Sequence, residues 1–335
     1  MTLETETLLD VRAVSKFYQS SGSLFSSGQT VKAVNQVSFQ VRKGETLGLV
    51  GESGCGKSTL GRTILRLTSA SEGEVYYHGQ NLFALSKREM RNMRQKLQMI
   101  FQDPYASLNP RMNVEELVRV PLDVFQIGTR ASRRDRVVEI LEIVGLGEQH
   151  LGRFPHEFSG GQRQRLGIAR ALILQPEFVV CDEPVSALDV SVRAAVLNLM
   201  KDLQRQFQLT YLFISHDLSV VNYLCDRVAV MYLGQIVEIA EKEELFRNPL
   251  HPYTKALMKA IPVPDIQKRG KTELLEGDVP SPLSLPAGCL FHTRCPYCTE
   301  QCRRERPDLR EKSYGHCVAC HLDVSEAVYE QQRDH

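Results

Sequence analysis

No stretch of this 335-residue sequence approaches the ~20 consecutive apolar residues that a membrane-spanning helix requires. The first ten residues contain neither a basic segment nor an apolar one, so we expect no secretory signal there. Charge of one sign is also lacking. The formal net charge is +1, which creates no strong field toward nucleic acid or an anionic membrane. These absences favour a cytosolic chain whose role at any membrane comes through partners.

Cysteine is scarce over most of the chain and concentrated near its end. Three of the nine cysteines are scattered, and the other six fall between Cys289 and Cys320. In a reducing cytosol such a cluster is more typical of a metal site than of a disulfide framework. The chain is 42% apolar, which is normal for a globular protein with a full core, and its length allows two domains.

The most informative stretch is Gly-Glu-Ser-Gly-Cys-Gly-Lys-Ser at 51–58. The apolar run 46–50 before it predicts a buried strand, and 59–65 after it predicts the start of a helix. This context distinguishes a phosphate-binding loop from an ordinary glycine-rich turn. The glycines let backbone N–H groups approach phosphates, and the helix N-terminus adds partial positive charge. Lys57 can then reach the β- and γ-phosphates, and the Ser58 hydroxyl can bind Mg²⁺.

Short polar segments follow three apolar runs that predict strands: Gln102, Asp182-Glu183 and His216. The run before Asp182 is apolar throughout, which is typical of a parallel strand buried on both faces. Ligands of open α/β sheets bind beyond the carboxyl ends of the strands. We therefore expect these residues and the loop 51–58 to meet at one edge of a sheet.

Two further segments complete the pattern. Ser-Gly-Gly-Gln at 159–162 opens a predicted helix, where a serine cap and bare N–H groups form a second anion-binding device. Apolar residues at helical spacing between 113 and 150 predict a helical subdomain, whereas the first 80 residues are rich in predicted strands. The sequence thus predicts an α/β protein with a β-rich N-terminal part.

These motifs, in this order, resemble the ATP-binding subunit of ABC transporters, over residues 8 to about 258. The resemblance implies an α/β P-loop NTPase core with an N-terminal antiparallel β subdomain and a helical subdomain at about 103–158. The implied division is an ATP-binding domain at 1–258 and a small Cys-rich C-terminal extension at 259–335. Phe158 stands where many members have leucine, a difference that does not touch the chemistry.

The resemblance also implies a role for each site residue. Glu183 would be the catalytic base that polarises the attacking water, and His216 would contact the γ-phosphate. Ser58, Gln102 and Asp182 would surround Mg²⁺. The residues implied to bind ATP are Tyr18, Gly51, Ser53, Gly54, Cys55, Gly56, Lys57, Ser58, Thr59, Gln102, Ser159, Gly160, Gly161, Gln162, Asp182 and Asp189.

One chain would carry only half of this site. The turn 159–161 lies too far along the chain, beyond the helical subdomain, to cover the phosphates of its own loop. In the family, two subunits stack head to tail, with ATP between the loop of one and the turn of the other. Asp189 would help to join the halves, and Tyr18 would stack on adenine, for which a core aromatic is the alternative. ATP would close the dimer and hydrolysis would open it.

The C-terminal part narrows the resemblance. Residues 248–257, Asn-Pro-Leu-His-Pro-Tyr-Thr-Lys-Ala-Leu, resemble a segment that follows the ATPase core in oligopeptide and dipeptide importers and related nickel importers. A Pro-, Lys- and Glu-rich stretch at 261–286 predicts a linker. In the resembling subunits four tail cysteines bind a [4Fe–4S] cluster, and their matches by spacing are Cys289, Cys295, Cys302 and Cys320.

Two additional cysteines leave open which cysteines are the ligands and which metal they bind. Cys298 and Cys317 form Cys-x-x-Cys pairs with their neighbours, which also fit a zinc site. We therefore favour the iron–sulfur cluster, with Zn²⁺ and unligated thiols as alternatives. Either metal would help to fold a tail that has little apolar core of its own.

The resemblance implies an enzyme: an ATPase subunit that powers import of dipeptides or oligopeptides. Its implied partners are a second, different ABC ATPase, two transmembrane permeases and an extracytoplasmic peptide-binding protein. The insertion 22–28 and the sequence 51–62 match one of two sister ATPases, and residues 102–114 would meet a permease. The chain would lie at the cytoplasmic face of the cell (inner) membrane. The carried solute stays open, because selectivity lies in other chains.

Several rival functions are weighed against this one. A nickel or glutathione importer uses the same kind of subunit and remains an alternative. A soluble ABC ATPase of translation would have two copies of the core, and one of DNA repair a long coiled coil before Ser159. An exporter would not explain the tail. The tail arginines Arg294, Arg303, Arg304 and Arg306 alternate with acidic residues, so we expect a solvated face rather than a nucleic-acid site.

Overall fold

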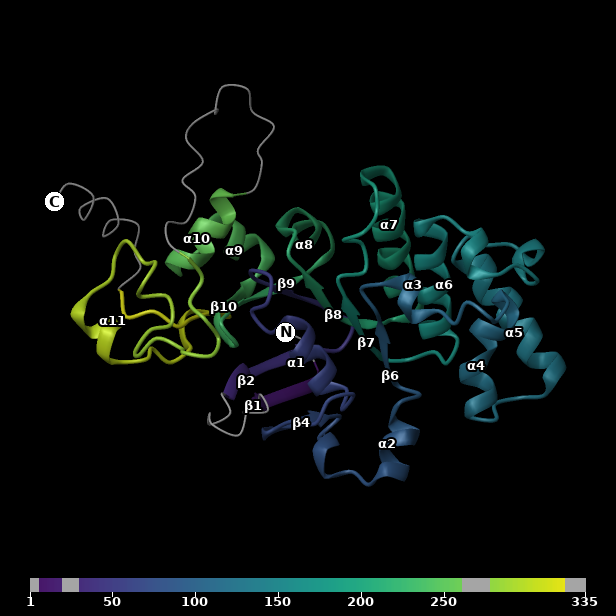
Figure 1. Cartoon of the computed structure of the whole chain (residues 1–335), viewed down its shortest axis with the longest axis horizontal. Coiled ribbons are helices and arrows are strands. Elements are labelled where there is room, and N and C mark those ends of the chain that lie inside the picture. Colours follow the sequence, from purple (N-terminus) through teal and green to yellow (C-terminus); the bar gives the residue numbers. More distant parts are fainter. Residues whose placement is uncertain (1–5, 20–29, 261–277, 323–335) are drawn as a thin grey trace, which may run out of the picture. The chain divides into compact units, whose positions relative to one another are not determined.

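The computed structural model describes residues 6–19, 30–260 and 278–322 (Figure 1). The insertion 22–28 and most of the predicted linker 261–286 lie outside these ranges. The described residues form two compact units. The first unit comprises 6, 41–46 and 84–214, and the second comprises 7–19, 30–40, 47–83, 215–260 and 278–322. No helix within the described ranges is long and apolar enough to cross a membrane.

The first unit is built on parallel strands, as their apolar runs predict. β7 (Phe178–Asp182) pairs in parallel with β6 (Leu97–Ile100) and with β8 (Thr210–Ser215). Every residue of β7 is buried, which explains why its sequence does not alternate between apolar and polar. In this register Ile100 lies opposite Cys181, so the chain segments after β6 and β7 leave the sheet at the same edge.

Helices make up the rest of the first unit (Figure 1). The predicted helical region between 113 and 150 is present as two helices, and both pack on the helix that follows the Ser-Gly-Gly turn. The first of them begins with a capping box, because Asn113 and Glu116 bond reciprocally to each other's backbone N–H groups. The helices are α2 (Lys87–Met93), α3 (Pro104–Ser107), α4 (Val114–Val124), α5 (Arg130–Ile143), α6 (Gly160–Leu172) and α7 (Val190–Phe207).

The second unit contains the predicted N-terminal antiparallel sheet. Its strand order is β2-β1-β4-β5. Leu9 and Val11 of β1 are fully buried opposite Tyr77 and Val75 of β4, so one face of this sheet is apolar. The bounds are β1 (Thr7–Gln19), β2 (Thr30–Arg42), β4 (Glu72–Tyr77) and β5 (Gln80–Asn81), with a 3₁₀ turn at Leu82–Ala84.

The C-terminal extension is part of a second sheet in this unit. β3 (Thr46–Val50) pairs in parallel with β9 (Arg227–Tyr232), and the order continues through β10 (Gln235–Glu241) and β12 (His316–Val318) to β11 (Arg310–Ser313). The sequence predicts neither of the last two strands. Both are short, and β11, at the edge of the sheet, is polar and exposed. The helices of the unit are α1 (Lys57–Ile64), α8 (Leu218–Leu224), α9 (Lys242–Arg247), α10 (Pro252–Lys259) and α11 (Glu300–Arg304).

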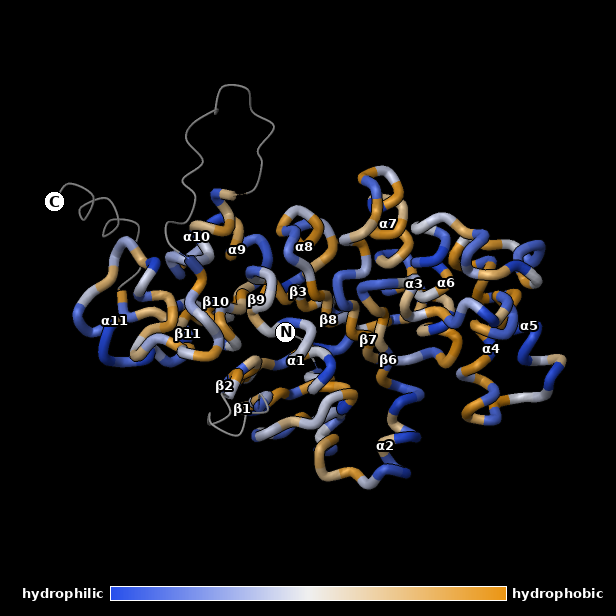
Figure 2. The backbone as a smooth tube through the Cα atoms, viewed as in Figure 1, coloured by the Kyte–Doolittle hydropathy of each residue, from blue (hydrophilic) through white to orange (hydrophobic). Residues whose placement is uncertain are grey.

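The hydropathy pattern follows this construction. Figure 2 shows hydrophobic residues along the central strands and hydrophilic residues over α11 and its surroundings. The extension nevertheless has a small apolar cluster, in which Val318 packs with Leu250 and with the partly buried side chains of Tyr297 and Leu322. A tail poor in apolar residues is therefore fixed by strand pairing and by packing on the His-Pro-Tyr segment.

Candidate functional site

The loop 51–58 connects β3 to α1, as a phosphate-binding loop requires. Gly51, Gly54 and Gly56 have φ of 152°, 79° and 108°, which side chains rarely adopt. A Cβ on Gly56 would overlap the carbonyl oxygen of Ala33, and one on Gly51 would overlap that of Met231. Gly56 is also the N-cap of α1, where no side chain bonds to the helix amides. The N-cap of α1 therefore has no side chain that could compete with an anion for the first amides of the helix.

Lys57 is the cation of this loop. Its side chain is buried, and Nζ donates to the carbonyl oxygens of Gly51, at 2.8 Å, and Glu52, at 2.9 Å. Burial raises the pKa of the neighbouring Cys55 thiol, although the charge on Lys57 opposes that rise. Cys55 is therefore a neutral thiol at pH 7. These contacts hold the ammonium over the loop, where it can exchange its carbonyl partners for phosphate oxygens.

In the first unit, the two predicted site carboxylates, Asp182 and Glu183, lie at the end of β7. Asp182 is its last residue and is fully buried, and Glu183 follows with φ of 45°, an uncommon conformation for a residue with a side chain. Gln102, beyond the end of β6, donates a hydrogen bond from Nε2 to Glu183 Oε2 at 3.0 Å. The structure therefore brings together the predicted glutamine and glutamate. The bond uses the amide nitrogen of Gln102 and leaves its oxygen as the atom suited to Mg²⁺.

The Ser-Gly-Gly-Gln turn begins α6, also in the first unit. Ser159 is the N-cap: its hydroxyl accepts from the Gln162 N–H at 3.4 Å, and the Gln162 side chain accepts from the Ser159 N–H at 3.0 Å. Gly161 is buried against Val192 of α7, which leaves no space for a Cβ. Asp189, the N-cap residue of α7, is exposed. The turn and Asp189 thus present polar groups at two exposed helix starts.

The two remaining predicted contacts lie in the second unit. Tyr18 is near the end of β1 and is 42% exposed, with Lys16 Nζ placed 5.0 Å from the ring centroid. The exposed ring is not the core aromatic that was the alternative. His216, after β8, is exposed, and Ser215 Oγ accepts the Asp217 N–H at 3.0 Å beside it. Both side chains can therefore contact a ligand in solution.

Four of the cysteines share one small cavity. Cys289, Cys295, Cys302 and Cys320 line it together with His251, His292 and His321. Burial raises the pKa of Cys295 to about 12, and the charges of Cys320, Cys289 and Cys302 add to the rise. All nine cysteines, which lie within the described residues, are free of disulfides. No group of three or more Cys, His, Asp or Glu side chains in the described ranges is arranged to hold a metal ion. The four cysteines predicted by spacing line this cavity, and Cys298 and Cys317 are not among its lining residues.

Comparison with known proteins identifies the family. A family model described as ABC transporter matches residues 34–186, and one described as oligopeptide/dipeptide transporter, C-terminal region, matches 237–302. The oligopeptide transport ATP-binding protein AppF of Bacillus subtilis is 52% identical over 323 residues, covering 95% of this chain and 98% of that protein. The chain belongs to the ABC transporter ATP-binding family.

Other relatives agree with that assignment. The oligopeptide transport ATP-binding protein OppF of Haemophilus influenzae is 49% identical over 321 residues, covering 94% of this ABC subunit and 97% of its own length. Among solved structures, the ATP-binding cassette MJ0796, as a post-hydrolysis dimer bound to ADP and Pi, superposes with a TM-score of 0.63. It is 28% identical and covers 70% of this chain and 99% of its own. The shared architecture is the ABC ATPase fold.

Glu52, Arg294 and Tyr253, whose roles the sequence does not predict, hold the phosphate loop of this ABC subunit. The Glu52 carboxylate accepts hydrogen bonds from Arg294 at 2.9 and 3.1 Å, and its N–H donates to the Tyr253 hydroxyl at 2.9 Å. The expectation of a solvated face was wrong for Arg294, whose side chain is only 5% exposed. It holds for Arg304, which is 75% exposed. No local pattern could reveal the contact, because Glu52 and Arg294 are 242 positions apart.

Proposed function

We propose that this chain is the ATP-hydrolysing subunit of an ABC importer for dipeptides or oligopeptides. The observation that carries the proposal is the strand–loop–helix at 46–64, in which the loop glycines have positive φ and Lys57 Nζ donates to a carbonyl oxygen of the loop. The C-terminal match at 237–302 and the names of the relatives support a peptide as the solute. The proposed division is an ATP-binding domain at 1–258 and the extension at 259–335.

The proposed nucleotide contacts follow from the chemistry of each group. Lys57 and the amides of 51–59 hold the phosphates, and Tyr18 stacks on the adenine. Ser58, Gln102 and Asp182 carry the hard oxygen atoms that Mg²⁺ prefers, so this donor set fits the ion. When bound, Mg²⁺ neutralises charge on the phosphate oxygens.

Glu183 is the proposed general base. Its carboxylate accepts a proton from the water whose oxygen forms a bond to the γ-phosphorus. The bond from that phosphorus to the bridging oxygen breaks, and ADP keeps the electron pair. The hydrogen bond from Gln102 orients the carboxylate, and His216 contacts the γ-phosphate. The strained backbone at Glu183 supports this assignment, because such conformations cluster at functional sites.

The variant Glu183→Gln tests this proposal. It keeps the shape of the side chain and one acceptor oxygen for the Gln102 amide but cannot accept the proton, so hydrolysis should fall by about 10²–10⁴-fold. MgATP should still bind, as titration calorimetry can measure. Glu139→Gln, at an exposed position on α5, is the matched control and should hydrolyse ATP normally. Normal turnover by Glu183→Gln would remove this residue from the role of base.

We further propose that the active form pairs two ATPase subunits. The Ser159, Gly160, Gly161 and Gln162 turn of one subunit would cover the ATP on the loop of the other, and Asp189 would help to join them. The second subunit is proposed to be a different ABC ATPase. The assembly would include two permeases and an extracytoplasmic peptide-binding protein and would lie at the cytoplasmic face of the cell (inner) membrane.

The solute can be tested by transport. Proteoliposomes that contain the subunit with its permeases should take up a labelled dipeptide or oligopeptide when ATP is enclosed and the binding protein is added outside. Nickel ions and glutathione are the competing solutes. Uptake of either one, with no uptake of peptide, would overturn the peptide assignment and leave the ATPase assignment standing.

The cysteine cavity is proposed to hold a [4Fe–4S] cluster, with Zn²⁺ as the alternative. The four thiols that line it support the proposal, since thiolates are ligands of both. Protein purified without air should contain iron and sulfide and lose visible absorption in air. Cys295→Ser should lose the metal, whereas Cys298→Ser, outside the cavity, should keep it. Zinc in place of iron would decide for the alternative, and metal-free protein would leave free thiols.

A further inference from the structure

Glu52 of the phosphate-binding loop contacts Arg294 of the C-terminal extension and Tyr253 of α10. Its carboxylate accepts two hydrogen bonds from the Arg294 guanidinium, its N–H donates to the Tyr253 hydroxyl, and its carbonyl oxygen accepts from Lys57. Each polar group of Glu52 is therefore engaged. Because Lys57 bonds to this carbonyl, the position of Glu52 also sets the position of the lysine that meets the phosphates.

The ion pair is a shielded one. The side chains of Arg294 and Glu52 are 5% and 25% exposed, and two parallel N–H···O bonds join them. Burial lowers the pKa of Arg294, but the hydrogen bonds to Glu52 and the charge of Glu52 outweigh it and raise the pKa above its ordinary value. A bidentate pair of this kind fixes orientation as well as distance. Removing one member leaves the other charge poorly compensated.

The second contact comes from a packed aromatic cluster. The Tyr253 ring is fully buried, with its centroid 4.6 Å from that of Tyr232 and 5.5 Å from that of Phe291. Phe291 in turn lines the cavity that contains the four cysteines. The Tyr253 hydroxyl is thus placed by side chains that form the cavity wall.

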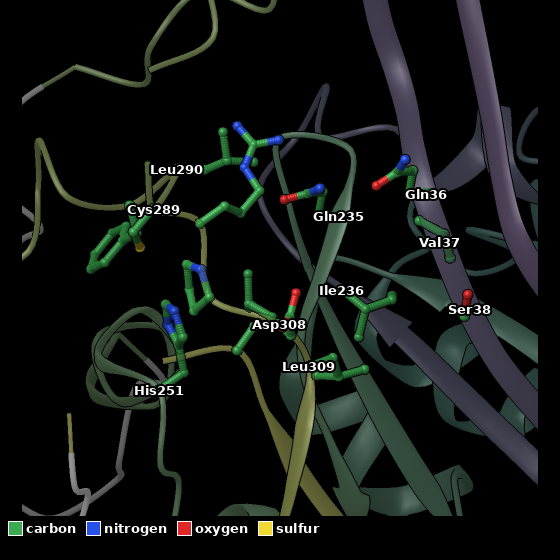
Figure 3. A pocket seen from close by; sticks show the side chains of 15 residues that line it. Gln36, Val37, Ser38, Gln235, Ile236, His251, Cys289, Leu290, Asp308 and Leu309 are labelled. Carbon is green, nitrogen blue, oxygen red and sulfur yellow. The ribbon is translucent and has the colours of Figure 1, made fainter. Parts of the chain in front are cut away.

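Both contacts therefore come from residues next to the cysteine cavity. Arg294 directly precedes Cys295, which lines the cavity. Figure 3 shows a larger hollow beside it, in which His251 and Cys289 lie on one side and Gln235 and Ile236 of β10 lie on another. His251 and Cys289 line both spaces. They form the wall between the cysteines and the hollow.

The His-Pro-Tyr segment and the C-terminal extension are both bonded to strand β10. Glu238 of β10 is fully buried, and its carboxylate accepts the N–H of His251 at 2.9 Å and that of Leu250. It also bonds to His316 Nε2, from the strand β12 of the extension, at 2.7 Å. The His-Pro-Tyr segment and the extension are therefore held on the same strand, so a change at the cysteines has a rigid base from which to act on the loop.

We propose that Arg294 and Tyr253 are positioning residues for the phosphate-binding loop, through which the cysteine-rich extension controls the affinity of this subunit for MgATP. The proposal rests on the proposed ATPase function. Loss of structure around Cys295 would release Arg294 and leave the Glu52 carboxylate beside the loop without its cation. The negative charge would then disfavour the phosphates, and Lys57 would lose a fixed carbonyl partner.

A double-mutant cycle on the full-length chain tests the proposal. Arg294→Gln and Glu52→Gln are measured singly and together, with the Kd for MgATP and the KM and kcat for hydrolysis as readouts. Arg294→Gln should weaken binding about tenfold or more, because an unpaired carboxylate remains beside the phosphate site. The double variant should bind better than Arg294→Gln, since it lacks that carboxylate. The effect should appear in KM more than in kcat.

Three further variants make the result decisive. Arg304→Gln breaks an exposed 2.8 Å pair with Glu300 in the same extension and should bind normally. Arg294→Lys keeps the charge and should recover part of the affinity. If Arg294→Gln does not fold, Tyr253→Phe, which removes only the hydroxyl, should still weaken binding.

The outcomes separate the two proposals. Unchanged Kd in Arg294→Gln and Tyr253→Phe, with a lower melting temperature alone, would show a purely structural contact and overturn this inference. Additive effects in the cycle would also overturn it, because Arg294 would then act by a route other than Glu52. A wild-type chain that binds no MgATP would overturn the proposed function and this inference with it.

Discussion

At the scale of single residues, the phosphate loop is specified by steric exclusion more than by attraction. Gly54 and Gly56 both have positive φ, but only Gly56 also lies against backbone atoms. A Cβ at Gly54 would meet no atom within 4 Å, whereas a Cβ at Gly56 would overlap the Ala33 carbonyl oxygen. The two glycines are therefore required for different reasons, one for its conformation and the other also for space.

The pair Gly54→Ala and Gly56→Ala separates these reasons. Gly54→Ala should lose about 1–2 kcal/mol of the free energy of unfolding, the cost of a left-handed alanine. Gly56→Ala should lose more and should also weaken MgATP binding, because the loop must move away from Ala33. Urea unfolding and nucleotide titration measure the two effects. Equal losses in both variants would mean that the close approach at Gly56 is unimportant.

At the scale of elements, the helix caps show how one residue can serve two purposes. Asn113 begins α4 and Ser159 begins α6, each with a reciprocal capping box. The bond from the Gln162 N–H to Ser159 Oγ is long, at 3.4 Å, whereas that from the Glu116 N–H to Asn113 Oδ1 is 2.9 Å. The serine hydroxyl is thus the more weakly held group, as suits a cap that also contacts phosphate in the proposed dimer.

Ser159→Ala and Asn113→Ala should therefore differ in activity but not in stability. Each removes a cap and should cost ~1 kcal/mol of unfolding free energy. Only Ser159→Ala should also reduce ATP hydrolysis, because only this hydroxyl is proposed to meet the nucleotide. Thermal unfolding and phosphate release, measured on the same samples, give the comparison. Equal activity in both variants would reduce Ser159 to a structural cap.

The sequence predicted elements well where the pattern is local. The apolar runs of β7 and β8, the strand–loop–helix around Lys57 and the capped start of α6 lie within a few residues of their expected positions. Strands β11 and β12 were not predicted, because their stability comes from pairing rather than from their own composition: β12 pairs with β10, and the edge strand β11 pairs with β12. The meeting of Gln102 with Glu183 was predictable, because parallel neighbours end at the same edge.

The tail shows why the remainder was not predictable. A charged residue among other charges suggests a solvated face, yet Arg294 is buried against Glu52 whereas Arg304 is exposed. Arg294 and Arg304 lie in sequence segments of similar, charged composition. Only tertiary contacts with residues far away in the sequence distinguish the two arginines. The same limit applies to the cysteines. Spacing suggested four ligands, and these four line one cavity, but no group of three or more Cys, His, Asp or Glu side chains in the described ranges is arranged to hold a metal ion.

At the scale of the whole molecule, the question is whether one chain suffices. The loop 51–58 belongs to the second compact unit, and the Ser159 turn belongs to the first. If the turn of another subunit completes the ATP site, the rate of hydrolysis per chain must fall on dilution, because dimers dissociate. Dilution series of the wild-type chain at fixed, saturating MgATP measure this directly. In addition, light scattering should show a higher molar mass for Glu183→Gln when MgATP is added, because the variant should stay dimeric. Full activity at every dilution would mean that each chain holds a complete site.

Complementation then distinguishes two copies of this chain from two different chains. Lys57→Ala lacks a working loop but keeps its turn, and Ser159→Ala keeps its loop. Each variant alone should hydrolyse less ATP than the wild-type chain. If this chain pairs with itself, an equal mixture should regain about a quarter of the wild-type sites, because half of the dimers are mixed and each mixed dimer has one intact site. The mixture could instead be no more active than the single variants. If hydrolysis by the wild-type chain then depends on concentration only when a sister ATPase is present, the functional pair is the proposed heterodimer.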